Sequence, residues 1–335
     1  MKCIVIDNVN NLSGAPLICN EIAETLELNI YNLRQSSSPL YKSSGFGCYS
    51  DSATMYPFSI LFLLFNLSFL KSFIASEMII CNTSLTWFFV ILGRLFRKKI
   101  VLVLHESSKK NVLYKISIPL SISCANIVVT PSKQAYLDLD IPMCKWRIIN
   151  NKLKNDYLSY TPKKRSFTES VNILFVDGSR EYKGSRLFHS FRETFDRSLL
   201  NGGGILSTTD EEFISKYSFS GSLNPQIYND FDIVLVLTDN RFWRETFGLV
   251  GAEAAACGAL PIFTDSYAYL EIWEKFSKDL YVKEYELQSL ISCIDAIITS
   301  PKESDLLRNQ VKSHVNKVCC TSNFSLRWKQ LILEM

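Results

Sequence analysis

The sequence predicts an α/β protein with two domains, each built on a parallel sheet. Short apolar, β-branched runs alternate with longer segments of helical pattern, as in folds where helices cover a parallel sheet. With 335 residues and 47% hydrophobic composition, the chain is long and apolar enough for two cores. The polar segment 151–170, which contains Pro162 and a run of three cations, has the composition of an interdomain linker.

The first strand is expected over residues 2–6, in an apolar run that is too short for a signal peptide. A polar loop over 7–14 and a helix over 15–26 follow, and Pro16 suits the first turn of that helix. Gly14 lies between strand and helix. A glycine there lets the backbone come close to a phosphate, although a plain turn would have the same sequence.

Three further strands of the first domain are expected to end at one edge of its sheet. They cover residues 78–81, 100–104 and 127–130, and the polar residues that follow them are Asn82, His105 with Glu106, and Pro131 with Ser132. His105 is a candidate functional residue because it directly follows a strand and precedes a carboxylate. A short strand over 147–150 closes the domain.

Between residues 34 and 99 the chain contains one polar and two apolar segments. Residues 34–55 are rich in Ser and Gly and predict a mobile loop. Residues 56–70 are strongly apolar but too short to span a bilayer. A buried helix packed on the sheet and a helix partly immersed in a membrane surface both fit this pattern. Residues 85–99 favour the second interpretation, because they are aromatic and end in four cations, Arg94, Arg97, Lys98 and Lys99.

Composition excludes several classes of function. A net charge of +3 is too small to indicate nucleic-acid binding. Ten cysteines at irregular spacing suit a reducing cytoplasm better than a disulfide framework. No cluster of His, Cys and carboxylates has the spacing of a metal site, and Asp138 and Asp140 lie late in a helix expected over 133–140. We therefore expect a cytoplasmic protein that binds no metal and no cofactor.

The second domain is expected to open with a strand over 171–176. The loop after it contains Arg180, Lys183 and Gly184, which could hold a phosphate or could simply be a solvated loop. A buried strand over 233–237 comes later, then a polar loop over 238–246. A helix of small residues follows from Gly248 to about Cys257, with Gly258 as its left-handed cap and a strand over 260–264.

Two carboxylates frame the start of that helix. Glu245 lies in the loop before it, and Glu253 lies about one and a half turns inside. The backbone N–H groups of Phe247, Gly248 and Leu249 lie at the helix N-terminus, where the macrodipole favours an anion. Carboxylates repel phosphate but accept hydrogen bonds from hydroxyls, so the pattern indicates a phosphorylated, hydroxyl-rich ligand such as a sugar nucleotide.

These residues carry a family resemblance. Glu-x7-Glu enclosing Phe-Gly-Leu-Val, followed by Cys-Gly-Ala-Leu-Pro, resembles the signature of retaining GT-B glycosyltransferases of family 4, the glycosyl transferases group 1 type. The resemblance implies two Rossmann-like domains facing across a cleft. Residues 1–160 would form the acceptor-binding domain and 166–318 the nucleotide-sugar-binding domain. The helix in 319–335 would pack back on the first domain, and residues 34–55 would lie on the acceptor side.

The resemblance also implies residue roles. His105 and Glu245 would lie beside the transferred sugar as catalytic residues. The donor-binding residues would be Gly14, Arg180, Lys183, Phe247, Gly248, Leu249 and Glu253. One departure concerns the loop after residue 265, where the family usually has two glycines near the donor sugar. This chain has Ser266, Tyr267, Ala268 and Tyr269 there, which puts the identity of the donor in doubt.

The expected function is that of a retaining hexosyltransferase (EC 2.4) with a nucleotide-sugar donor. Its acceptor would be a glycan, such as a lipid-linked or cell-surface polysaccharide intermediate of O-antigen, capsule or lipopolysaccharide type carried on polyprenyl diphosphate. The enzyme would work without metal on the inner face of the cytoplasmic membrane, in peripheral contact with anionic lipid. A 2-epimerase acting on a sugar nucleotide and a catalytically silent glycan-binding protein are the alternatives.

Overall fold

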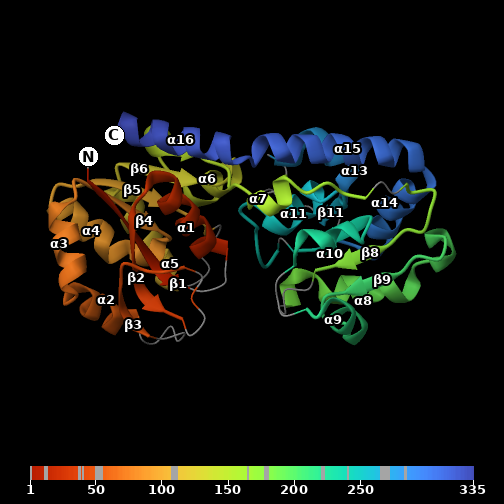
Figure 1. Ribbon diagram of the computed structural model, residues 1–335, viewed down its shortest axis with the longest axis horizontal. Helices are drawn as coiled ribbons and strands as arrows, with labels where there is room; N and C mark the ends of the chain where they lie inside the picture. The colour runs from red at the N-terminus through yellow and green to blue at the C-terminus, as the bar shows by residue number, and fades with distance from the viewer. Residues whose placement is uncertain are drawn as a thin grey trace. The chain divides into compact units, whose positions relative to one another are not determined.

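The computed structural model describes residues 2–10, 14–36, 39, 41–49, 56–106, 112–163, 166–176, 181–219, 223–239, 241–264, 272–282 and 285–335. The chain divides into two compact units. Unit 1 comprises Met1–Asn151 with Phe324–Met335, and unit 2 comprises Lys152–Asn323 (Figure 1). Each unit contains one parallel sheet covered by helices, as the alternation of strand and helix patterns predicts.

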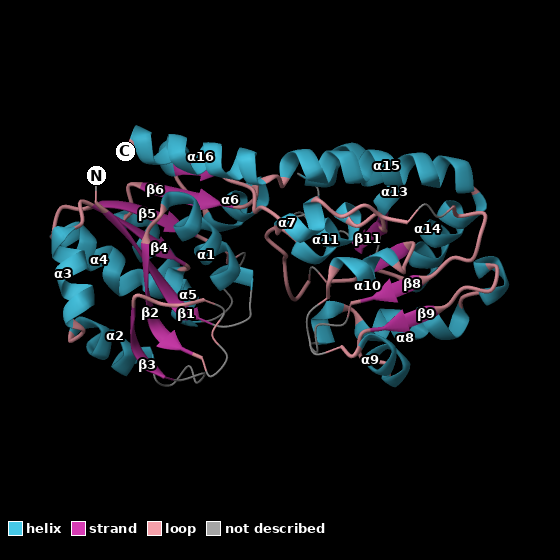
Figure 2. Ribbon diagram, viewed as in Figure 1, coloured by secondary structure: helices cyan, strands magenta, loops and turns pink. Residues whose placement is uncertain are grey.

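Unit 1 is built on a seven-stranded parallel sheet in the order β3-β2-β1-β4-β5-β6-β7. The strands are β1 Cys3–Asn10, β2 Asn29–Gln35, β3 Gly45–Tyr49, β4 Met78–Asn82, β5 Lys99–Val103, β6 Ile127–Thr130 and β7 Trp146–Ile148 (Figure 2). The strand order reverses between β1 and β4. Ligands of open α/β sheets bind at such a switch point, outside the carboxyl ends of the strands.

Helices cover both faces of this sheet. They are α1 Gly14–Leu26, α2 Tyr56–Leu64, α3 Leu67–Ala75, α4 Trp87–Leu95, α5 Val112–Cys124, α6 Lys133–Leu139 and α16 Thr321–Glu334, with short 3-10 turns at Ser84–Thr86 and Met143–Lys145. Successive residues of a strand point to opposite faces. Ile4 and Ile6 therefore pack with helices α2 to α5, whereas Val5 packs with α1 and with α16.

Unit 2 has a five-stranded parallel sheet in the order β12-β11-β10-β8-β9, which reverses between β8 and β10. Its strands are β8 Ile173–Phe175, β9 Ile205–Ser207, β10 Ile233–Val236, β11 Leu260–Thr264 and β12 Tyr281–Val282. Its helices are α7 Asn155–Leu158, α8 Ser185–Thr194, α9 Glu211–Tyr217, α10 Pro225–Asn229, α11 Leu249–Ala256, α13 Ser277–Leu280, α14 Leu287–Thr299 and α15 Pro301–Val318, with 3-10 turns at Glu181–Lys183, Arg197–Leu200 and Glu274–Phe276.

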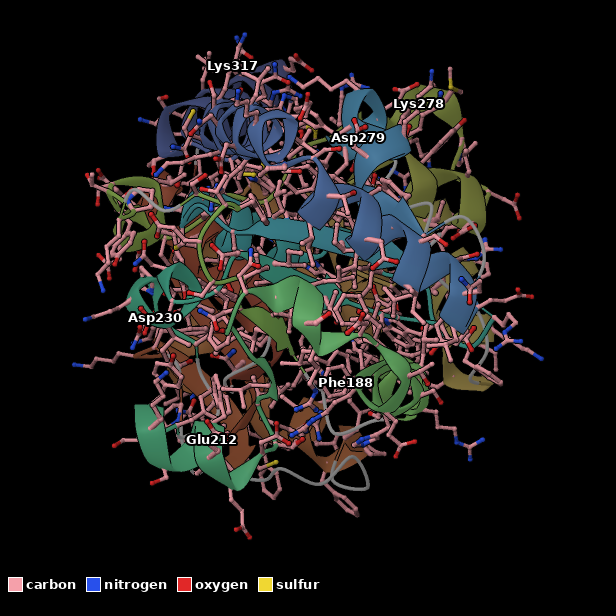
Figure 3. All side chains as sticks on the ribbon, turned by 90° about the vertical axis from the view of Figure 1, so that its right-hand side faces the viewer. Phe188, Glu212, Asp230, Lys278, Asp279 and Lys317 are labelled. Carbon is pink, nitrogen blue, oxygen red and sulfur yellow. The ribbon has the colours of Figure 1, made fainter. Side chains whose placement is uncertain are left out.

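The core of unit 2 is rich in aromatic side chains. Phe188 is fully buried and stacks on Phe175, with ring centroids 4.4 Å apart. Figure 3 shows Phe188 among the packed side chains, while Glu212 and Lys317 lie at the periphery of the unit. Trp273 is also fully buried, beside Phe263 of β11.

The predicted strand–helix–strand unit around α11 is confirmed. Strands β10 and β11 are parallel neighbours, and Ile233 pairs with Leu260. Gly258 follows the helix with a φ of +89°, the left-handed cap that was expected.

Three expectations about unit 1 were wrong. Strand β1 continues to Asn10, so Asp7 lies in a strand and not in a loop. The segment predicted as one mobile loop contains β3, whose Gly45 pairs with Tyr31 of β2. Residues 56–70 do not form one helix, because α2 and α3 meet at a bend of 73°. The Asn66 side chain starts α3 by accepting a hydrogen bond from the Phe69 N–H at 3.0 Å.

Among the described residues, no single helix is both long and apolar enough to cross a membrane. In the part of the chain that the structure describes, the bent pair α2 and α3 passes such a test of length and composition when its two helices are taken together.

Candidate functional site

Glu253 lies inside α11 as a largely buried carboxylate. Its Oε2 accepts a hydrogen bond from the Tyr228 hydroxyl at 2.9 Å. Burial raises the pKa of Glu253 to about 7, and the bond from Tyr228 partly opposes that rise. Tyr228 was not predicted as a partner, because it belongs to α10 and lies 25 positions away. The carboxylate is therefore held in one orientation before any ligand arrives.

Glu245 forms an ion pair with Lys183. The Lys183 ammonium contacts Glu245 Oε1, and the Thr238 hydroxyl lies 3.4 Å from the same oxygen. Both charged side chains are partly exposed, at 28% for Lys183 and 19% for Glu245. Two residues that the sequence suggested separately, 62 positions apart, thus meet at the switch point of the second sheet.

Gly184 fixes the position of Lys183. Its φ is +96°, and a Cβ added there would lie 2.2 Å from the Leu237 carbonyl oxygen. Only a glycine lets the turn after Lys183 lie this close to the end of β10. The Tyr182 ring stacks on Trp243 with centroids 5.5 Å apart, and the Asp239 N–H donates to the Tyr182 carbonyl at 2.8 Å. These contacts tie the Lys183 turn to the loop that carries Glu245.

The N-terminus of α11 is formed by backbone rather than by polar side chains. Gly248 precedes the helix with a φ of +73°, and Leu249 is its first residue. The Phe247 side chain is 3% exposed and belongs to the core, so only its backbone is available to a ligand. Gly251 lies against the sheet, because an added Cβ would approach the Phe263 ring to 2.4 Å. The small residues of α11 thus allow a close approach of helix and sheet.

In unit 1, His105 follows β5 and contacts the residue that ends β4. Its Nε2 lies 2.9 Å from Asn82 Oδ1. Burial lowers the pKa of His105 to about 4, so the ring is neutral at pH 7. Burial also raises the pKa of the neighbouring Glu106, whose Oε1 accepts hydrogen bonds from the backbone N–H and the hydroxyl of Ser84, both at 2.8 Å.

Asp7 is a buried carboxylate that the sequence did not single out. It is 1% exposed and accepts hydrogen bonds from the Asn82 side chain at 2.8 Å and the Tyr41 hydroxyl at 3.0 Å. Burial raises the pKa of Asp7 to about 6. Asp7, Asn82 and His105 come from three strands or strand ends, and the sheet brings them together.

The structure says less about three predicted positions. Gly14 is the first residue of α1 and is exposed. Arg180 and residues 266–269 lie outside the described residues. Within the part of the chain that is described, no group of three or more His, Cys, Asp or Glu side chains is placed to hold a metal ion.

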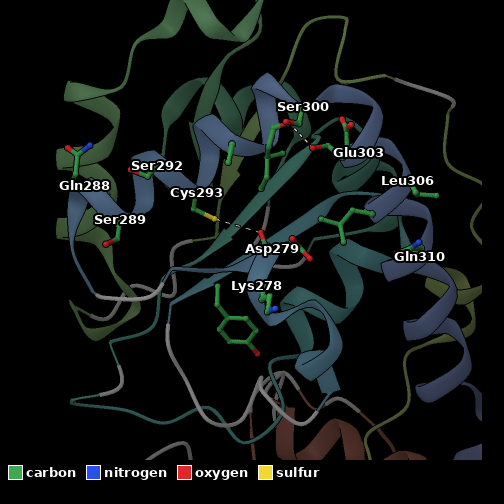
Figure 4. A pocket seen from close by; sticks show the side chains of 15 residues that line it. Lys278, Asp279, Gln288, Ser289, Ser292, Cys293, Ser300, Glu303, Leu306 and Gln310 are labelled. Carbon is green, nitrogen blue, oxygen red and sulfur yellow. Dashed lines mark hydrogen bonds between the residues drawn. The ribbon is translucent and has the colours of Figure 1, made fainter.

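A cavity of about 690 Å³ lies elsewhere in unit 2, among α13, α14 and α15 (Figure 4). Its lining includes Lys278, Asp279, Ser289, Cys293 and Glu303, and none of the predicted site residues. The Cys293 thiol lies 3.8 Å from the Asp279 carbonyl oxygen, an internal contact of this wall. The cavity is therefore separate from the candidate site.

Comparisons with known proteins show which sequences and folds this chain is similar to. Residues 210–314 match the family model described as "Glycosyl transferases group 1", and this range includes both Glu245 and Glu253. A search of curated proteins found no match.

Solved structures share the fold over the whole chain. HepE of Anabaena in complex with UDP has a TM-score of 0.76 at 13% identity, with 100% of both chains covered. Sucrose-phosphate synthase of Thermosynechococcus elongatus has a TM-score of 0.74 at 14% identity, with 100% of this chain and 99% of that one covered. A glycosyltransferase of Rickettsia africae has a TM-score of 0.70 at 15% identity, with 99% and 98% covered. The fold is GT-B, and with a glycosyl transferases group 1 match in its second unit the chain is a glycosyltransferase.

Proposed function

We propose that this enzyme transfers a sugar from a nucleotide-sugar donor to a glycan acceptor with retention of anomeric configuration. The observation that carries the proposal is the pair of carboxylates around the α11 N-terminus. Glu253 is held by Tyr228, and Glu245 is paired with Lys183. Glu253 would accept hydrogen bonds from the donor ribose, and Glu245 from the transferred sugar. The structures of HepE with UDP and with UDP-glucose make uridine nucleotides the first donors to test.

The chemistry follows from charge. Transfer breaks the bond between the anomeric carbon and the diphosphate oxygen, and forms one to the acceptor oxygen. Negative charge then builds on the diphosphate, where the Lys183 ammonium and the N–H groups of Gly248 and Leu249 stabilise it. The diphosphate takes the acceptor's proton, so no covalent intermediate and no metal are needed. Arg180 would add a second cation, and Gly14 would bring the α1 N-terminus near the diphosphate.

His105 would contact the transferred sugar as a neutral ring. Its pKa of about 4 means that it contributes a hydrogen bond rather than a positive charge at pH 7. Positioning, more than acid–base catalysis, is therefore its proposed contribution.

The test combines binding and turnover. Glu253→Ala should weaken UDP binding by about 1.5 to 3 kcal/mol, because a charged hydrogen-bond acceptor is lost. This corresponds to a loss of affinity of roughly ten- to a hundredfold. Glu245→Ala should mainly lower turnover. Wild-type binding and turnover in both variants would refute the assignment. A new sugar epimer formed from donor alone would instead indicate the epimerase.

We further propose a lipid-linked acceptor, such as an O-antigen or capsule intermediate on polyprenyl diphosphate, reached from the inner face of the cytoplasmic membrane. The support is an apolar surface on α2 and α3, here called the elbow surface. It consists of Phe58, Leu61, Phe62, Phe65, Leu67 and Ile74, all exposed. Phe65 and Leu67, on either side of the bend, are 79% and 72% exposed. The opposite faces of the two helices, with Leu63 and Phe69, pack in the core.

Only part of the predicted cation cluster can meet anionic lipid. The Lys98 ammonium turns inward to the carbonyl groups at the end of α3 and lies 4.8 Å from the centre of the Phe73 ring. The Lys99 ammonium contacts the Met335 carbonyl oxygen. Arg94, Arg97 and Lys71 are exposed and are the better candidates. Each contributes about 1 kcal/mol near an anionic surface, reduced by salt.

Flotation with anionic vesicles at low salt tests the elbow surface. Replacing Phe65 and Leu67 by serine should abolish flotation, and Arg94→Glu with Arg97→Glu should weaken it. Leu333→Ser is the matched control, because Leu333 is 86% exposed on α16, away from the elbow. Flotation that is absent in the wild type, or equal in all variants, would refute the membrane proposal.

A further inference from the structure

A chain of hydrogen bonds runs through the buried edge of the first sheet and ends at His105. The Asn32 side-chain amide donates to the Tyr41 hydroxyl at 2.7 Å, and that hydroxyl donates to Asp7 Oδ2 at 3.0 Å. Asp7 Oδ1 accepts from Asn82 Nδ2 at 2.8 Å, and Asn82 Oδ1 lies 2.9 Å from His105 Nε2. Asp7 and Asn82 are buried, at 1% and 0% exposure.

An ionised carboxylate in this chain determines the direction of every bond around it. A carboxylate only accepts hydrogen bonds, so both Tyr41 and Asn82 must donate to Asp7. Asn82 Nδ2 has a second acceptor, the Ala15 carbonyl oxygen at 3.2 Å. A flipped amide would place its oxygen against the Asp7 oxygen and the Ala15 oxygen, with no hydrogen between them. The orientation of the Asn82 amide is thus fixed by its neighbours.

The fixed amide in turn selects one form of the imidazole. Because Asn82 Oδ1 is an acceptor, His105 Nε2 must carry the hydrogen of their bond. A neutral imidazole has one N–H, so Nδ1 then has the lone pair. The low pKa of His105 agrees with a neutral ring.

We propose that Asp7 is a positioning residue for glycosyl transfer, which acts through Asn82 to hold His105 as the Nε2–H tautomer. In this tautomer Nδ1 has the lone pair and can act in a hydrogen bond only as an acceptor. Asp7 itself does not touch the substrate. The role in transfer rests on the proposed function, whereas the tautomer does not, and the two are tested separately.

The tautomer is measured directly in the full-length wild-type protein without any ligand. Two-bond proton–nitrogen correlations in ¹⁵N-labelled protein distinguish Nε2–H from Nδ1–H rings. The chain has three histidines, so His105→Gln assigns the His105 signals. His314 is an internal reference, because its Nε2 lies 2.8 Å from the Ile272 carbonyl oxygen and must also donate. A His105 signal of Nε2–H type is expected at pH 7 and 8. An Nδ1–H pattern, or averaging between tautomers, would overturn the inference.

The dependence on Asp7 is measured in variants that keep the size of the side chain. Asp7→Asn can both donate and accept, so Asn82 Nδ2 keeps only its longer bond to the Ala15 carbonyl oxygen as a fixed contact. The preference for one amide orientation is then reduced, and His105 should show a mixture of tautomers. Transfer, as kcat/KM, should fall about tenfold, the cost of one hydrogen bond, with UDP affinity unchanged. Tyr41→Phe leaves the bond between Asp7 and Asn82 in place and should keep the tautomer.

Two outcomes of the variant experiment would count against the proposal. If Asp7→Asn keeps the pure Nε2–H signal, Asp7 does not select the tautomer. If Asp7→Asn changes the tautomer and kcat/KM stays at the wild-type value, the positioning role in transfer is wrong. Loss of UDP binding in Glu253→Ala is independent of both results, so a failure here is distinguishable from a failure of the proposed donor site.

Discussion

Replacing Glu253 by glutamine should remove a pH dependence of folding stability. In the folded protein burial raises the pKa of Glu253 from 4.5 to about 7. Between these values the folded state binds a proton that the unfolded state has released, so stability falls as pH rises through the window. The stabilisation is fully present below pH 4.5 and is lost above pH 7. A difference of about 2.5 pH units corresponds to roughly 3 kcal/mol.

Urea unfolding of the wild type and of Glu253→Gln from pH 5 to pH 8 measures the contribution of Glu253 to the pH dependence of stability. The free energy of unfolding of unit 2 should fall with pH more steeply in the wild type than in the variant. The pKa of Asp7 is raised from 3.8 to about 6, so Asp7 also makes the free energy of unfolding fall as the pH rises. Because Asp7 is present in both proteins, its contribution cancels when they are compared. Parallel pH profiles would show that Glu253 does not titrate with a raised pKa, and would refute the reasoning.

Tyr228→Phe is the matched control for this experiment. The Tyr228 hydroxyl favours the ionised form of Glu253, since its hydrogen bond lowers the pKa that burial has raised. Without it the pKa of Glu253 should rise further, and the loss of stability should extend to higher pH. If the pH range over which stability is lost does not change in this variant, the hydrogen bond at 2.9 Å does not stabilise the ionised form of Glu253.

Three further predictions follow from single features of the chain. The His105 ring signals in NMR should not titrate between pH 6 and 8, because burial lowers its pKa to about 4; a midpoint near 6.5 would contradict the burial. Gly184→Ala should destabilise unit 2 by about 1 to 3 kcal/mol in urea unfolding and should lower transfer, because the new Cβ meets the Leu237 carbonyl. Gly202→Ala is its control, with a φ of +85° but no atom within 4 Å of the added Cβ, and an equal loss in both would exclude packing as the cause. Transfer should persist in EDTA, and loss of activity restored by Mn²⁺ would contradict metal-independent stabilisation of the diphosphate.

Features of the fold that depend on local pattern could be predicted from the sequence. The buried run over β10, the small residues of α11 and the cap at Gly258 each have a local cause, and all lie where the sequence placed them. Strand β3 was missed because it is rich in Gly and only half-buried, so it lacks the apolar signal of a buried strand. The bend before α3 had a signal that was overlooked, the Asn66 cap inside an apolar run.

The partners of the site residues depend on topology and could not be predicted. Asp7 and Asn82 are 75 positions apart and meet only because β1 and β4 are neighbours in the sheet. The ion pair of Lys183 with Glu245 has the same origin in β8 and β10. Sequence alone identified most of the charged residues around α11, whereas the raised pKa of Glu253 follows from burial that only the fold determines.

The return of α16 to unit 1 has a consequence for the order in which the chain folds during synthesis. Phe324, Trp328 and Leu331 are at most 3% exposed and complete the core on one face of the first sheet. The residues between 152 and 323 belong to unit 2 and leave the ribosome before α16 does. Unit 2 can therefore finish folding while one face of unit 1 still exposes Val101 and Val129 to the solvent and to chaperones. In this protein the first domain to be made is the last to be completed.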